Sequence, residues 1–174
     1  PSSGTFMAGA NIDWTNSGNI TNTADANYAT ATFGGLGNTD YLLGSNYGFA
    51  IPTGAIINGI VVNIRRSTSA INGGRITRDN DVYLVKGGVI VGNDKATTTA
   101  YTTSLTVATY GSATDTWGTT WTPAEINATN FGAVLSVNAN NSLTTTVDYI
   151  RITVHYTTIG FSTASACINS NASV

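Results

Sequence analysis

The sequence predicts an all-β domain, a two-sheet antiparallel β-sandwich of jelly-roll-like type with one short helix near residues 123–127. Three observations indicate this fold. Charged residues make up 9% of the 174 positions, which is too few for long salt-bridged helices. Thirty threonines and many valines, isoleucines and tyrosines favour strands. Short apolar segments alternate with clusters of Gly, Asn and Thr along the chain, as strands joined by turns do.

Two segments show the alternation of a half-buried strand. In 55–65 four apolar side chains stand at even positions from Ile56 to Ile64, whereas Asn63 and Arg65 stand at odd positions. Segment 148–156 alternates in the same way, with Tyr156 on the apolar face. Further strands are expected near residues 26–33, 47–51, 81–86, 89–91, 104–108 and 131–137.

Turn and cap residues fit between these strands. Gly87 and Gly88 predict a tight hairpin, because glycine accepts a positive φ at both central turn positions. Thr122, Pro123 and Glu125 have the spacing of a capping box with proline at the first helical position. The sequence therefore predicts a sandwich domain over residues 1–156, followed by a polar C-terminal arm or linker over 157–174.

The charge and hydropathy patterns argue against several partners. The net charge of −2 is not that of a general nucleic-acid binder. The sequence contains no run of 18 apolar residues, so no transmembrane helix and no membrane insertion are expected. The sequence begins at Pro1 without a signal-peptide pattern, which is expected either after signal removal or after trimming of an initiator methionine.

No residue pattern predicts an enzyme or a cofactor. A Ser-His-Asp or Cys-His arrangement needs a base, and His155, the single histidine, is expected on the outward face of a terminal strand, whereas Cys167, the single cysteine, lies in the tail. A glycosidase needs two facing carboxyl groups, and Glu125, the single glutamate, is explained by the helix cap. Asp79 and Asp81 are weak candidates for calcium; a solvated loop that begins a strand is the simpler interpretation.

Four of the seven cationic residues lie within 14 positions: Arg65, Arg66, Arg75 and Arg78. They are expected to flank one hairpin tip that could meet an acidic partner or a polyanionic glycan. The alternative is that Asp79 and Asp81 pair with them on an exposed edge, which stabilises little.

Tryptophans give the last candidate site. Trp117 and Trp121 could form a stacking platform for a sugar ring, together with Trp14. The alternative is that these rings plug the end of the sandwich core.

Three longer segments carry a family resemblance: 46–64, with Pro-Thr-Gly before a core strand; 114–132, with a Trp-Gly loop and Asn-Phe-Gly; and 147–156. Together they resemble a poorly characterised β-sandwich module of phage virion structural proteins and bacterial surface proteins. The resemblance covers roughly residues 14–156. It implies the sandwich fold and assigns no catalytic residue.

The function expected from these observations is that of a non-enzymatic virion structural protein, either a capsid decoration (cement) subunit or a fibre subunit. Such a protein acts through contacts with other virion proteins and with itself, and a closed trimer is expected. The alternative is a bacterial extracellular module: an adhesin, a filament subunit or a carbohydrate-binding domain that recognises a surface glycan. The expected location is accordingly the virion or, in the alternative, the cell surface.

Overall fold

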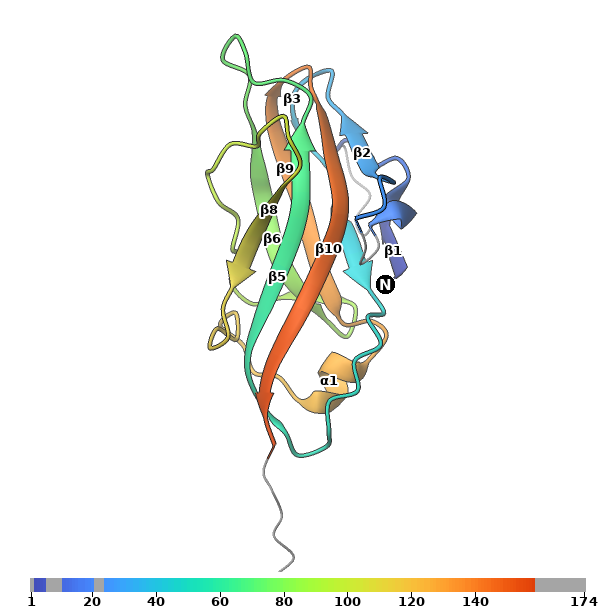
Figure 1. The fold of residues 1–174 in the computed structure, drawn as a ribbon, viewed down its shortest axis with the longest axis vertical. Coiled ribbons are helices and arrows are strands. Elements are labelled where there is room, and N and C mark those ends of the chain that lie inside the picture. The colour runs from blue at the N-terminus through green and yellow to red at the C-terminus, as the bar shows by residue number, and fades with distance from the viewer. Residues whose placement is uncertain (1, 6–10, 21–23, 159–174) are drawn as a thin grey trace, which may run out of the picture.

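The computed structural model describes residues 2–5, 11–20 and 24–158. In it the chain folds into two antiparallel sheets that pack face to face (Figure 1). The chain passes repeatedly from one sheet to the other, since β4, β6 and β9 belong to one sheet and β5, β8 and β10 to the other. These crossings are those of a jelly-roll-like sandwich, and they confirm the predicted fold class.

The six-stranded sheet has the order β1-β4-β9-β6-β7, with β3 paired to the last residues of β9. Its strands are β1 (Ser2–Thr5), β3 (Gly35–Asn38), β4 (Leu42–Ser45), β6 (Thr77–Lys86), β7 (Val89–Val91) and β9 (Gly132–Asn141). The four-stranded sheet has the order β2-β10-β5-β8. Its strands are β2 (Ala29–Thr32), β5 (Ile56–Thr68), β8 (Thr106–Gly111) and β10 (Thr144–Thr157).

The core lies between the two sheets. Ile60, Val62 and Ile64 of β5 are fully buried, as the alternation predicts. They face apolar side chains of the other sheet that include Leu135 and Val137 of β9. This burial of apolar area supplies the main favourable term in folding.

The predicted face is wrong at the ends of the two long strands. Ile56 is 56% exposed and Tyr156 is 43% exposed, whereas Ile57 is buried. The register between β5 and β10 shifts here, because His155 and Tyr156 pair with Gly59 and Ile57 and leave Asn58 unpaired. The extra residue in β5 reverses the orientation of the β5 side chains beyond it, from Ile57 to Ile56. Tyr156 is the second-last residue of β10, at the exposed end of that strand.

Segment 47–51, predicted as a strand, is a loop. Asn46 and Gly48 both have positive φ angles, 55° and 72°, which no extended strand accommodates. Strands β1, β3 and β4 were not predicted, because their glycines interrupt any apolar pattern.

The predicted turn and helix are confirmed. Gly87 and Gly88 have φ angles of 60° and 83° and join β6 to β7. Helix α1 (Pro123–Asn127) begins with both reciprocal hydrogen bonds of the capping box between Thr122 and Glu125. A short 3₁₀ helix, η1 (Ser17–Asn19), lies near the N-terminus. No helix within the described ranges is long and apolar enough to cross a bilayer; the predicted arm lies outside them after residue 158.

We predict that Gly59→Ala destabilises the fold by about 2–3 kcal/mol. A Cβ atom at this position would collide with the backbone of Ser112 and Ala113, and backbone cannot rotate away. Urea denaturation measures the change in unfolding free energy. Gly35→Ala is the matched control, because a Cβ there meets nothing within 4 Å; an equal loss in both variants would contradict the steric explanation.

Candidate functional site

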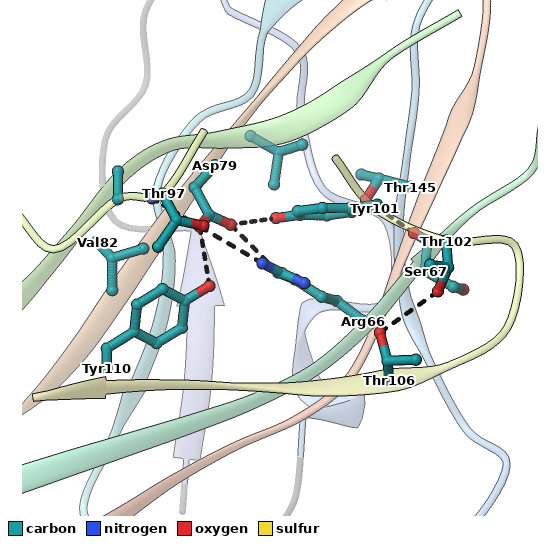
Figure 2. A network of polar contacts seen from close by, with 12 residues as sticks. Arg66, Ser67, Asp79, Val82, Thr97, Tyr101, Thr102, Thr106, Tyr110 and Thr145 are labelled. Atoms are coloured by element: carbon teal, nitrogen blue, oxygen red, sulfur yellow. Dashed lines mark hydrogen bonds and ion pairs between the residues drawn. The ribbon is translucent and has the colours of Figure 1, made fainter. Parts of the chain in front are cut away.

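A buried polar network joins the two sheets around the carboxylate of Asp79 (Figure 2). Arg66 of β5 lies against it, with Nε 3.2 Å from Oδ1 and Nη2 3.4 Å from Oδ2. The hydroxyls of Tyr101 and Tyr110 donate to the same carboxylate over 2.8 and 3.0 Å. Thr97 donates to Oδ2 from both its backbone N–H and its hydroxyl, each over 3.0 Å.

This network makes Asp79 and Arg66 structural residues. Asp79 accepts six hydrogen bonds, so its lone pairs are already occupied by protein donors and none is left for a metal ion. The Arg66 guanidinium stacks 3.9 Å from the ring centroid of Tyr101 and is buried. Burial raises the pKa of the Tyr101 and Tyr110 hydroxyls, and the Asp79 charge raises it further, so both phenols stay protonated donors.

The four arginines do not form one cationic tip. Arg66 points inward, whereas its neighbour Arg65 points outward and forms a close ion pair with Asp148. Arg75 lies in the turn between β5 and β6, and Arg78 lies on β6 opposite Asn138. The pairing of Arg66 with Asp79 is therefore inside the sandwich and not on the exposed edge that the sequence suggested.

Both candidate tryptophans lie inside the fold, as core plugs. Trp117 is fully buried, and its indole N–H donates to the carbonyl of Ile60 over 2.8 Å. Trp121 is 8% exposed and packs edge-on against Phe131, with ring centroids 5.4 Å apart. Trp14 is buried as well, at 6% exposure. None of the three rings offers a free face to a sugar.

The outward face of the six-stranded sheet carries a different cluster, formed by Tyr41, Asp81 and Tyr83. Asp81 and Tyr83 lie on β6 opposite Ser136 and Val134 of β9. Tyr41 directly precedes β4 on the other side of β9, and its hydroxyl donates to Asp81 Oδ2 over 3.1 Å. All three cluster residues are partly exposed, and together they form what we call the tyrosine cluster.

The tyrosine cluster has an acidic character. Burial and the Asp81 carboxylate raise the pKa of Tyr41 to about 12. Burial also raises the pKa of Tyr83, and the charges of Asp94 and Asp81 add to the shift. Both hydroxyls are therefore neutral donors at physiological pH, beside two carboxylates.

Sequence reasoning missed this cluster, although one signal was present. Asp81 and Tyr83 are two residues apart and so share a face of any strand that contains them. Tyr41 comes near Asp81 because β4 and β6 are both paired with β9, and no local sequence pattern reveals this strand order. His155 lies on β10 of the other sheet, Cys167 lies outside the described residues, and the described ranges bring no three His, Cys, Asp or Glu side chains together.

We predict that Arg66→Met destabilises the protein by about 3–5 kcal/mol, because it leaves the Asp79 charge buried without its cationic partner. Chemical denaturation measures the difference in unfolding free energy between the variant and the wild-type protein. Arg75→Met in the exposed turn is the matched control and should change stability by less than about 0.5 kcal/mol. A loss of the same small size at Arg66 would contradict a structural role for the buried pair.

Trp121→Ala should cost about 3–5 kcal/mol, since it opens a cavity beside Phe131. The melting temperature by circular dichroism is the measurement. An unchanged melting temperature would show that the indole is dispensable for packing and would restore Trp121 as a binding candidate.

Comparison with known proteins adds two distant structures. No family model matches the sequence, and no curated protein matches it. A CBM4 structure is 13% identical, with 76% of this chain and 87% of that chain covered and a TM-score of 0.43. A family 11 carbohydrate-binding module of a cellulosomal cellulase of Clostridium thermocellum is 15% identical, with 91% and 88% covered and a TM-score of 0.41. These similarities assign no family, so the function is argued from the chain's own surface.

Proposed function

We propose that this chain is a non-enzymatic binding module that recognises a neutral glycan through the tyrosine cluster. The observation that carries the proposal is the placement of two partly exposed phenol rings around one carboxylate, on the outward face of a sheet. A module of this kind would work outside the cell or at the cell surface.

The chemistry of the cluster suits a sugar. Pyranose rings present apolar C–H faces that pack on aromatic rings, and their hydroxyls hydrogen-bond to carboxylates and amides. Tyr41 and Asn80 both donate to Oδ2 of Asp81, which leaves Oδ1 for a ligand hydroxyl. The amide of Asn80 is held in turn near Ser136, whose Oγ lies 3.3 Å away. The acceptor is therefore fixed before a ligand arrives, and this lowers the ordering cost of binding.

The charge around the cluster selects against acidic ligands. Asp81 and Asp94 both act electrostatically on Tyr83, so a uronic acid or sulfated sugar would meet like charge. A neutral hexopyranose chain avoids this repulsion. The cluster spans neighbouring strands on the face of the sheet, so the ligand would lie along the sheet face as an extended chain.

The virion role that the sequence favoured, with its trimer and its capsid or fibre partners, has gained no supporting observation and stays a prediction. It would use the same surface differently, through a broad protein contact. A binding screen against glycans separates a glycan-binding module from a decoration subunit, because a decoration subunit acts through protein–protein contacts and is not expected to retain a soluble polysaccharide.

We predict that the wild-type protein is retarded by a neutral polysaccharide in affinity electrophoresis, and that Tyr83→Ala weakens binding about tenfold or more through loss of one ring contact. Tyr41→Phe keeps the ring but loses the hydroxyl that orients Asp81, so it should weaken binding less. Tyr156→Ala is the matched control, because Tyr156 is an exposed tyrosine on β10 of the other sheet.

Equal binding by wild type and Tyr83→Ala would reject the tyrosine cluster as the site. No retention on any neutral polysaccharide would reject the proposed function. Melting temperatures of all variants must stay near that of wild type for the comparison to hold.

A further inference from the structure

A second carboxylate stands out because it is buried and unpartnered. Asp40 is 1% exposed, and neither of its carboxylate oxygens accepts a hydrogen bond. Asp79 and Asp148, also buried, each face an arginine, whereas none of the ion pairs between described residues involves Asp40. A buried carboxylate without a partner is costly, and proteins resolve this cost by protonation, by an ion pair or by a bound cation.

The backbone brings two further oxygen-bearing side chains to this carboxylate. Segment 11–14 runs beside segment 38–40: Ile12 bridges Thr39 in parallel, and the N–H of Asp40 donates to the carbonyl of Ile12 over 3.0 Å. Asn11 and Asp13 flank Ile12, and both side chains lie close enough to act on the Asp40 carboxyl. Both are exposed, so the group is open to solvent on one side.

We propose that Asp40, Asp13 and Asn11 bind a divalent cation, Ca²⁺ by preference. The site is independent of the tyrosine cluster and of the Asp79 network. Two carboxylates and one amide offer up to five side-chain oxygens, and water on the exposed side completes the six to eight that Ca²⁺ requires. The ligands are all hard oxygens, without the histidine or cysteine that zinc prefers.

The electrostatics of the group agree with a missing cation. Asp13 and Asp40 follow the bridged residues Ile12 and Thr39 on two parallel backbone segments, and the Asp40 carboxylate is buried. The carboxyl pair therefore repels itself at neutral pH unless a proton or a cation lies between the two groups. A shared proton is the competing explanation, and the experiment below distinguishes it from a cation.

Thermal unfolding of the full chain at pH 7 in EDTA and in millimolar Ca²⁺ or Mg²⁺ is the first test. We expect Ca²⁺ to raise the melting temperature by roughly 5–15 °C when it is well above its dissociation constant, and Mg²⁺ to raise it less. Asp40→Asn and Asp13→Asn should abolish this shift. Asp115→Asn is the matched control and should keep it, because Asp115 pairs with Lys95 in a different loop.

Terbium luminescence gives a second readout at the site itself. The indole N–H of Trp14 donates to the backbone carbonyl of Asp40 over 2.8 Å, so a Tb³⁺ ion bound there should be sensitised by excitation of Trp14. Calcium should quench the emission by competition, and Trp14→Phe should lower it sharply while the calcium-dependent melting shift remains.

Two results would overturn the proposal. One is a melting temperature that neither Ca²⁺ nor Mg²⁺ changes, together with a gain in stability for Asp40→Asn, which is the result expected for a carboxyl pair that shares a proton. The other is a calcium shift that persists in Asp40→Asn. Neither result bears on glycan retention, so this proposal and the proposed function fail separately.

Discussion

The carboxylate of Asp79 is the point on which the arrangement of the two sheets depends. Asp79 belongs to the six-stranded sheet, whereas its partners Arg66 and Tyr110 belong to the four-stranded sheet. A third partner, Tyr101, lies in the loop that connects β7 to β8. Replacing a buried ion pair by apolar residues is often neutral or stabilising, so the pair contributes little net free energy. We infer that its role is specificity, because a different relative placement of β5, β6 and β8 would leave some of these donors without the Asp79 carboxylate.

A one-residue bulge in β6 directs two nearby aspartates, Asp79 and Asp81, to opposite faces of the sheet. Asn80 is the extra residue between Asp79 and Asp81, since the register of β6 against β9 shifts there. Asp79 points into the core and meets Arg66, and beyond the bulge Asp81 points outward to Tyr41. The bulge is also why these two aspartates do not form a cation site together: Asp79 has its lone pairs occupied, and Asp81 faces a different group of residues.

Sequence reasoning succeeded where the determining interactions are local. The Gly87-Gly88 hairpin, the Thr122 capping box and the alternation of Ile60 to Ile64 each depend on residues a few positions apart. It failed where the determinant is distant. The burial of Arg66 depends on Tyr101 and Tyr110, and the exposure of Ile56 depends on a shift in pairing with β10. The tyrosine cluster and the Asp40 group are of the second kind, because each unites segments that only the strand order brings together.

Asp40 and Tyr41 are consecutive, yet they serve different faces of the molecule. The position of Tyr41 does not depend on the Asp40 group alone, because Thr39 already ties this segment to β9: its hydroxyl accepts from the N–H of Val137, and its carbonyl accepts from Ser136. These bonds hold the entry to β4 whether or not a cation is bound. A cation at Asp40 therefore acts on the free energy of joining segment 11–14 to the sandwich, and it leaves the geometry of the tyrosine cluster to the sheet beneath it.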